Sequence, residues 1–428
     1  VLMLIKKISI IHKDPGLLFF LAIVVVIMFY SFGNFGFLNI FDARLPIQIT
    51  LLSTTGTLFI LFFMIYFKKL INEPIFLLVV SFIIMDLFIR FDIKSVIANV
   101  ITMIVISFIL MVKVKYIHLI LKGIIYLALI FSLMSILLYI IIINNELDVN
   151  SIFISTYFSG SGNDYIPVSN YEYLGFLVND SGSTLFGQQV YRFKAFASEP
   201  SVLVYSILTP GILAIYYKKY LSFSIIMFFS IFLVLSGTII MSIFLGILFY
   251  IAYMLGKRNA KISTGIIWSF LFFFIIFIFF INVSDFMNNV IEFMKVSSSI
   301  SSMPIQKYNS GVIRLSGLQE AITQISFFGS DSIDHGATGF IIVCGLKSGI
   351  IGIVLNFIIF SKLFIYMFTI IKHNKIMLSL LGGVLIQVQF FSAYGWSSFT
   401  GLIMITIIYR IIKNEYLNKT LLKEEIIR

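Results

Sequence analysis

Apolar runs of roughly 16 to 25 residues recur along the whole chain, and this feature limits the possible folds more than any other. Of the 428 residues, 60% are apolar and 11% are charged, whereas soluble domains carry about one quarter charged residues. A bilayer core about 30 Å thick needs about 20 helical residues to cross it. Helices satisfy their backbone hydrogen bonds within the segment, as lipid requires. The sequence therefore predicts an all-α polytopic membrane protein, with residues 1–428 as a single membrane domain.

These runs predict about twelve membrane spans. Their approximate bounds are 17–32, 47–67, 74–90, 95–112, 121–143, 201–217, 221–236, 238–255, 264–281, 338–371, 376–391 and 398–412. No small-residue cleavage site follows the first run, so we expect a retained span and not a signal peptide. An even number of spans places both termini on one side of the membrane.

The distribution of basic residues predicts which side this is. Short loops rich in Lys and Arg face the cytoplasm, and cytoplasmic termini place about 20 of the 30 basic residues inside. The net charge of +11 is then a signature of orientation and predicts no nucleic-acid partner. We expect a multi-pass protein of the cytoplasmic membrane with the lipid bilayer as its surroundings.

Two connections are much longer than the rest, 144–200 and 282–337, and this orientation places both outside the cytoplasm. Loops of this length in compact proteins are usually functional or disordered. The first loop mixes aromatic residues with Gly, Asn, Asp and Ser, and Tyr165 and Tyr173 are candidates for stacking on sugar rings. An ordinary polar loop is the alternative.

The second long loop begins with a Ser-rich stretch and then becomes periodic. Apolar residues follow helical spacing at Leu315, Leu318, Ile322 and Ile325. We expect an amphipathic helix on the outer surface, which starts near Arg314 and stops at Gly329.

Cations are few on the predicted outer side: Arg44, Arg90, Lys94, Arg192, Lys194, Lys295, Lys307, Arg314 and, near the membrane, Lys347. The planar fork of arginine matches phosphate oxygens, and a charge near lipid is costly enough to need a partner. For Arg44 a structural pair with Asp42 is the favoured interpretation. For Arg90 it is a pair with Asp92. A functional role is favoured for Arg192 and Arg314, because each lies where a long loop meets a helix.

Two outer residues are candidate general bases. His335 is the only histidine on the predicted outer side, and a neutral imidazole can take a proton from a hydroxyl group. Glu199 precedes Pro200 at the start of the sixth span, so it either acts as a base or only favours the helix start through the dipole. Asp86 is the one carboxylate predicted within a span, where a hydrogen-bonded interhelical role is favoured over proton transport.

Familiar catalytic motifs are absent from the sequence. It has no Walker phosphate loop, no His-Glu-x-x-His, no Cys-x-x-Cys and no Gly-x-Ser-x-Gly. Its single cysteine, Cys344, excludes an intrachain disulfide. We expect no metal site and no cofactor.

Three segments together resemble the O-antigen polymerase family of bacteria, within the O-antigen polymerase and ligase superfamily. They are RFKAFASEPSVLVYS, LSGT, and RLSGLQEAITQISFFGSDSIDHGATGFIIVCGLKSGIIGI, and they cover about residues 190–355. The first is similar to the family's Arg, aromatic and Glu-Pro-Ser motif before a membrane helix. The others are similar to its Ser-Gly-Thr turn and to its Arg, amphipathic helix and Gly-Ile-Ile-Gly sequence.

The resemblance implies a membrane glycosyltransferase of the GT-C-like type, at the outer face of the bacterial inner membrane. Its reaction would join polyprenyl (undecaprenyl) diphosphate-linked repeat units into O-antigen or capsular polysaccharide, with a chain-length regulator protein as a possible partner. The resemblance assigns catalytic roles to Arg192, Arg314, Glu199 and His335. Scarce charge and the loop aromatics give Lys194, Arg90, Arg44, Tyr165 and Tyr173 as candidate substrate-binding residues.

A polytopic scaffold without enzymatic activity is a general alternative, and two other specific functions remain open at this point. One is the related O-antigen ligase. The other is a flippase for the same lipid-linked units, although carriers usually show duplicated halves and no repeat between the halves of this chain is visible.

Overall fold

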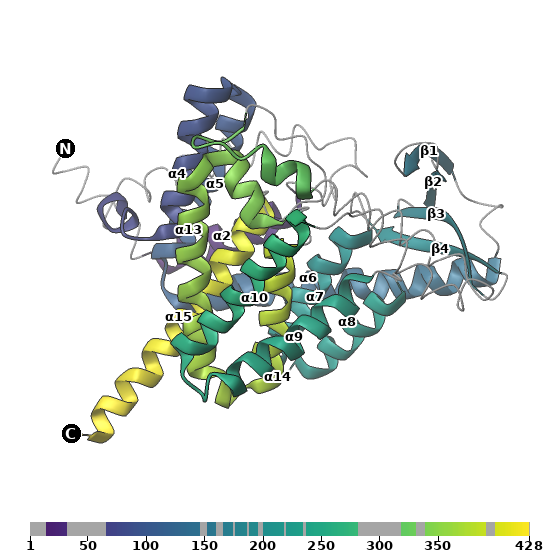
Figure 1. Ribbon diagram of the computed structural model, residues 1–428. Coiled ribbons are helices and arrows are strands. Elements are labelled where there is room, and N and C mark those ends of the chain that lie inside the picture. Colours follow the sequence, from purple (N-terminus) through teal and green to yellow (C-terminus); the bar gives the residue numbers. More distant parts are fainter. Residues whose placement is uncertain are drawn as a thin grey trace.

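The computed structural model is a bundle of helices with a small β-sheet at one side (Figure 1). It describes residues 14–31, 66–145, 152–159, 166–173, 176–185, 188–195, 200–217, 220–233, 237–280, 318–330, 339–390 and 399–427.

The helices of this bundle follow the apolar runs of the sequence. They are α2 (Pro15–Ser31), α4 (Pro74–Met85), α5 (Ile93–Met111), α6 (Val114–Asn145), α7 (Pro200–Tyr216), α8 (Leu221–Leu233), α9 (Gly237–Leu255), α10 (Ala260–Phe280), α13 (Phe340–Ile370), α14 (Lys375–Phe390) and α15 (Phe399–Ile427). A π-helical turn, η2 (Asp86–Arg90), extends α4, and a 3-10 turn, η6 (Ile371–His373), follows α13. Every predicted span except the second coincides with one of these helices, and 47–67 lies almost wholly outside the described residues.

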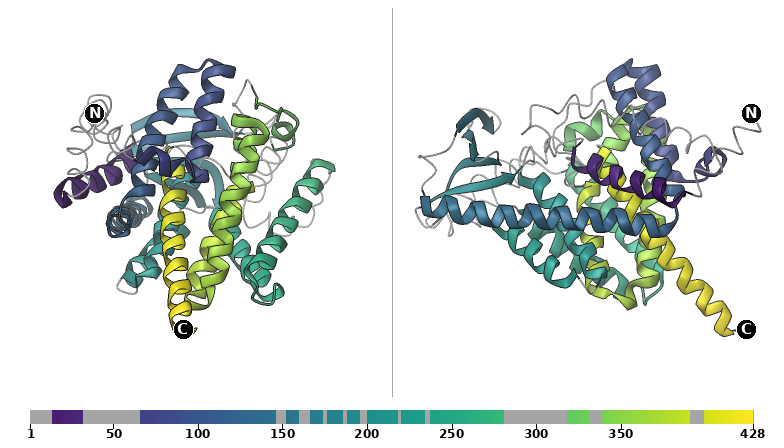
Figure 2. Two further views of the ribbon diagram at one scale, coloured as in Figure 1. Left: turned by 90° about the vertical axis from the view of Figure 1, so that its left-hand side faces the viewer. Right: turned by 180° about the vertical axis from the view of Figure 1, so that it is seen from behind.

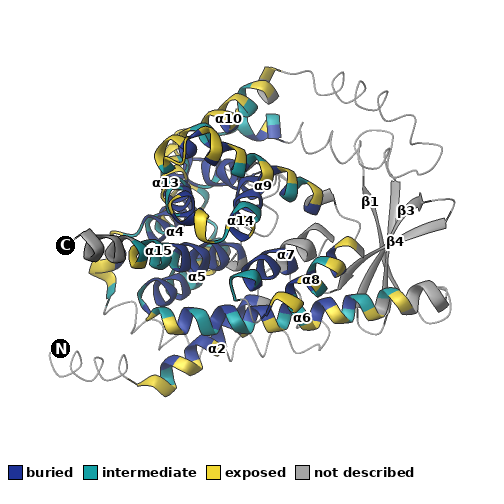
Figure 3. Cartoon of the chain, turned by 90° about the horizontal axis from the view of Figure 1, so that it is seen from below, coloured by how far each residue is buried: buried dark blue, intermediate teal, exposed yellow. Residues whose placement is uncertain are grey.

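Three helical stretches within the described residues are long and apolar enough to cross a membrane: Val114–Leu137, Ala260–Phe277 and Phe340–His373. The apolar stretches of other helices, among them α2, α5, α9 and α14, are shorter than these three. Helix α10 presents large apolar side chains outward, including Phe272, Phe273 and Phe280 (Figure 3). Apolar side chains on the outside are typical of a surface that faces lipid. The protein is thus a helical membrane protein, and the twelve-span topology stays a prediction.

Helices α9 and α14 pack closely against each other. A Cβ atom at Gly383 of α14 would lie 2.2 Å from the carbonyl oxygen of Ser242 on α9. Small residues let helix backbones approach closely, and this packing replaces the hydrophobic effect where lipid surrounds a protein. Ser242 Oγ also hydrogen-bonds Gln387 Oε1 across the same interface.

Helix α13 is broken near its start, which the single predicted span 338–371 did not anticipate. Ser348 (φ −140°, ψ 16°) and Gly349 (φ 59°, ψ −145°) leave the helical conformation. A Cβ atom at Gly349 would lie 1.9 Å from the Phe327 carbonyl oxygen. Glycine therefore permits both the left-handed φ and the close approach of the segment around Phe327.

The first long loop contains a β-sheet, so the all-α prediction is wrong for this segment. Strands β1 (Ile152–Ser159), β2 (Ile166–Tyr173), β3 (Phe176–Leu185) and β4 (Gln188–Ala195) form an antiparallel sheet in the order β1-β2-β3-β4. β1 is rich in aromatic and β-branched residues, which favour strands. Two residues separate β2 from β3 and β3 from β4, as in tight hairpins.

The sheet lies beyond the main bundle, where the long helix α6 extends out of it (Figure 2). Strand β4 contacts both α6 and α7. β4 is an edge strand of the sheet and the last strand before α7. Its contacts with α6 and α7 therefore connect this edge of the sheet to the bundle.

Candidate functional site

The predicted site residues divide into those that the structure describes and those that it does not. Arg44, Tyr165, Glu199, Arg314 and His335 lie outside the described residues. Arg192 and Lys194 lie on β4, and Tyr173 is the last residue of β2. Arg90 is the last residue of η2. The structure therefore places one predicted pair, Arg192 and Lys194, on a single strand and Arg90 in a separate cluster of polar side chains.

The backbone of β4 positions Arg192 and Lys194 close to the start of α7. Arg192 is paired in register with Asn179 of β3, and Lys194 falls at a β-bulge. The strand ends at Ala195 and α7 begins at Pro200, so the connecting chain can reach at most about 18 Å. Bulges often occur next to binding sites, where they redirect the strand.

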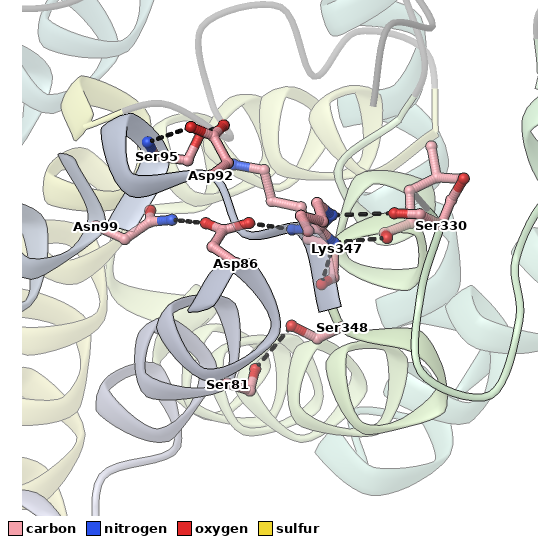
Figure 4. Close-up of polar contacts among 10 residues, drawn as sticks. Ser81, Asp86, Asp92, Ser95, Asn99, Ser330, Lys347 and Ser348 are labelled. Atoms are coloured by element: carbon pink, nitrogen blue, oxygen red, sulfur yellow. Dashed lines mark hydrogen bonds and ion pairs between the residues drawn. The ribbon is translucent and has the colours of Figure 1, made fainter. Parts of the chain in front are cut away.

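A second cluster joins η2 to the break in α13, and Asp86 is its centre. The Asp86 side chain is fully buried, and its Oδ1 pairs with Arg90 Nη1. Asn99 of α5 donates from Nδ2 to Asp86 Oδ2 at 2.7 Å. Figure 4 shows Asp86 between Asn99 and the guanidinium that reaches towards Ser330. Both carboxylate oxygens are thus hydrogen-bonded, as a buried charge requires.

Arg90 connects this carboxylate to the broken helix. Its Nη2 donates to the carbonyl oxygens of Leu346, at 3.0 Å, and of Lys347. Its Nε donates to the Ser330 carbonyl oxygen at 3.0 Å. The break at Gly349 deprives carbonyl groups just before it of their usual helical partners, and Arg90 supplies donors in their place. Arginine suits this role because its fork carries five N–H donors.

The predicted partner of Arg90 was wrong. Asp92 instead starts α5: its Oδ1 accepts from the Ser95 backbone N–H at 3.2 Å, and its Oδ2 from Ser95 Oγ at 2.6 Å. The π-helical turn carries Arg90 back over Asp86, four residues earlier. The favoured interpretation of Asp86, an interhelical hydrogen-bonded residue, is confirmed by its bond to Asn99.

Lys347 differs from the other charged residues of this cluster. Its ammonium nitrogen lies over the ring of Phe82 on α4, 5.2 Å from the ring centroid. Within the described residues its side chain makes no hydrogen bond and no ion pair, although Asp86 and Arg90 act on it electrostatically. Sequence reasoning counted Lys347 among the outer cations but assigned it no role, because its surroundings depend on the contact between α4 and α13.

A third polar group lies at the opposite end of α4. Glu73, the residue before α4, accepts from Lys413 Nζ of α15 at 2.9 Å. Arg410 of α15 donates to the Val112 carbonyl oxygen at 3.1 Å. A further hydrogen bond joins α7 to α15, because Tyr216 Oη donates to Glu415 Oε1. These contacts fasten α15 to the bundle.

Phenol and imidazole groups extend this third group. His118 Nδ1 hydrogen-bonds Tyr217 Oη, and Lys122 lies over the Tyr217 ring, 5.7 Å from its centroid. The Tyr217 hydroxyl acts here as a hydrogen-bonding group.

The described part of the chain contains no group of three or more His, Cys, Asp and Glu side chains able to hold a metal ion. Charge in this part is instead arranged as guanidinium, ammonium and carboxylate groups at helix ends and on β4. Such groups can bind anions and position polar substrates.

Comparisons with known proteins found no match. No family model, no curated protein and no solved structure is similar to this chain.

Proposed function

We propose that this protein is an oligosaccharide repeat unit polymerase, which joins polyprenyl-diphosphate-linked units at the outer face of the bacterial cytoplasmic membrane. The observation that carries the proposal is the position of Arg192 and Lys194 on β4, a few residues before the apolar helix α7. A diphosphate attached to a lipid lies at this kind of boundary between membrane and loop. The resemblance of the flanking sequence to O-antigen polymerases supports the same assignment.

The proposed reaction is a glycosyl transfer. A hydroxyl oxygen of the incoming unit forms a bond to the anomeric carbon of the growing chain, and the bond from that carbon to the diphosphate oxygen breaks. The lipid diphosphate leaves with the electron pair, and Glu199 or His335 takes the hydroxyl proton. Arg192 and Arg314 stabilise the negative charge that develops on the diphosphate. Lys194 and Arg44 add positive charge, and Tyr165 and Tyr173 bind the sugars.

Arg90, a candidate substrate-binding residue by its scarce charge, has a different role in this proposal. Its guanidinium already binds Asp86 and three carbonyl oxygens, so few of its donors remain for a substrate. It positions the end of α13 and does not bind diphosphate directly.

The test is elongation by the purified protein in liposomes that contain lipid-linked repeat units and no ion gradient. We expect wild-type protein to form chains of several units. Arg192→Ala should slow elongation by 10²-fold or more, on the order of the loss for one group that stabilises transition-state charge. Lys261→Ala is the matched control, because Lys261 is an exposed cation at the start of α10. No elongation by wild-type protein, or equal rates for both variants, would reject the proposal.

A flippase is the second candidate, and the break in α13 is the observation that favours it. Discontinuous helices often form the substrate sites of transporters. The same liposomes separate the two functions: movement of units across the bilayer without elongation supports the flippase. Transfer of finished chains to a lipid core acceptor, without elongation, supports the ligase.

A further inference from the structure

We propose that Lys347 binds the diphosphate group of the isoprenoid lipid, at the break in α13. The inference rests on the proposed function for the identity of the lipid. The site itself follows from three observations on α4, η2 and α13: an ammonium group that forms no ion pair within the described part of the chain, its depth in the bilayer, and the apolar surface beside it.

The first observation is the charge balance of the cluster. Asp86 and Arg90 neutralise each other, and Asn99 occupies the remaining carboxylate oxygen. Lys347 is left as an additional cation: among the described residues it forms no hydrogen bond and no ion pair, Asp86 acts on it without forming an ion pair, and its ammonium lies over the face of Phe82. A cation–π contact contributes about 0.5–2 kcal/mol, well below the cost of desolvating an unpaired ammonium. A phosphate oxygen would supply the missing partner.

The second observation is the depth of Lys347. The part of α13 after the break, Ile350 to Ile370, is about 30 Å long at about 1.5 Å per residue, which matches the hydrocarbon core of a bilayer. Lys347 precedes this part and therefore lies near one edge of the core. Arg90 and the α4–α5 turn at Phe91 lie at the same edge, because Arg90 binds the Leu346 and Lys347 carbonyl groups. Phosphate groups of lipids occupy this depth.

The third observation is the apolar surface beside the cation. Phe327, Phe328, Ile350 and Ile351 are exposed, and the Ile350 backbone N–H donates to the Phe327 carbonyl oxygen at 3.2 Å. The two segments that carry these exposed side chains therefore meet at the break. A half-buried lysine next to exposed apolar side chains suits an amphiphile with an anionic head and a hydrocarbon tail. A diphosphate carries more negative charge than an ordinary phospholipid and gains more from each cation.

The hydroxyl group of Ser348 lies next in sequence and is hydrogen-bonded to Ser81 Oγ at 3.1 Å. This bond joins α4 to the non-helical residue of α13 (Figure 4). The bond holds the residue that follows Lys347, whereas Arg90 holds the carbonyl groups of Leu346 and Lys347. Hydrogen bonds therefore hold the chain at Lys347 and on either side of it.

The test measures binding of undecaprenyl diphosphate to the full-length protein in nanodiscs of zwitterionic lipid. We expect Lys347→Met, which keeps the length of the side chain but removes its charge, to raise Kd about tenfold, or ~1.4 kcal/mol. Lys347→Arg should retain most of the affinity. The matched control is Lys362→Met, since Lys362 is an exposed lysine on the same helix. Thermal unfolding midpoints of all variants identify any loss of fold.

Competition distinguishes the possible sources of phosphate. Phosphatidylglycerol and soluble pyrophosphate should displace undecaprenyl diphosphate weakly. Displacement by either at equal concentration would overturn the assignment to a diphosphate lipid, as would an unchanged Kd in a folded Lys347→Met variant. The elongation assay is independent: wild-type protein that binds the lipid through Lys347 but forms no polymer rejects the polymerase and keeps the site. If the Lys347→Met variant elongates chains and binds the lipid with the wild-type Kd, the Lys347 site is rejected and the polymerase is kept.

Discussion

Two ion pairs flank the same helix, α4, and they differ in how far water reaches them. Asp86 and Arg90 follow α4, and their side chains are 0% and 5% exposed. Glu73 precedes α4 and pairs with Lys413, and these side chains are 14% and 25% exposed. The first pair also binds Asn99 and three backbone carbonyl groups. The partners of the buried pair are 4 residues apart and those of the partly exposed pair 340. The separation of two partners along the chain therefore does not indicate how deeply their pair is buried.

Burial determines the cost of breaking each pair. Removing one partner of a buried pair leaves a desolvated charge, which costs about 3–5 kcal/mol. An exposed pair contributes about 0–1 kcal/mol, because water replaces the lost partner. Substitutions at the two ends of α4 should therefore differ in their effect on the free energy of unfolding, and this difference tests the structure.

We expect the largest effect from Arg90→Ala. The substitution leaves Asp86 buried without its partner and frees three carbonyl groups, so the free energy of unfolding should fall by about 3–5 kcal/mol. Thermal or denaturant unfolding of the purified protein in detergent measures the loss. Asp86→Asn in the Arg90→Ala background should restore part of the stability, because it removes the unpaired charge. A stable Arg90→Ala protein would contradict the buried network.

Gly349→Ala should have the next largest effect, at the other side of the same cluster. The added Cβ would meet the Phe327 carbonyl oxygen at 1.9 Å, at a φ of 59°. Strain of this kind costs about 1–3 kcal/mol. Gly265→Ala is the control, because a Cβ at Gly265 meets nothing within 4 Å. In a helix it should be neutral or stabilise the protein by up to about 1 kcal/mol. Equal effects of the two substitutions would mean that α13 is not broken at Gly349.

Lys413→Ala should have the smallest effect. It breaks the partly exposed pair with Glu73 and the contact with the Tyr409 ring, 5.3 Å from the nitrogen to the centroid, and the expected loss is about 0.5–1 kcal/mol. High salt should reduce the difference from wild type. A loss as large as that of Arg90→Ala would remove the contrast between the two ends of α4.

The sequence predicted the helices well, because apolar runs of membrane length have few other solutions. It failed for the segment 144–200, since four short strands with polar residues give a weak signal next to such runs. It also treated 338–371 as one span. A single glycine in an apolar run does not reveal a break, which depends here on the approach of Phe327.

The candidate site was less predictable than the fold. Charge scarcity identified Arg90, Arg192 and Lys347 as unusual, and that signal needs only the sequence. Their partners come from distant parts of the chain: Arg90 meets Leu346, and Lys347 meets Phe82. These contacts arise when α4 packs on α13, and no local pattern encodes that pairing.

The length of surface polysaccharide in cells tests the central claim most directly. A strain that carries Arg192→Ala at normal protein level should show single repeat units on a gel in place of long chains, as should a deletion strain. Lys261→Ala should leave the long chains unchanged. Long chains that persist in the deletion strain would contradict the proposed polymerase, and finished chains that remain unattached to their core would identify a ligase.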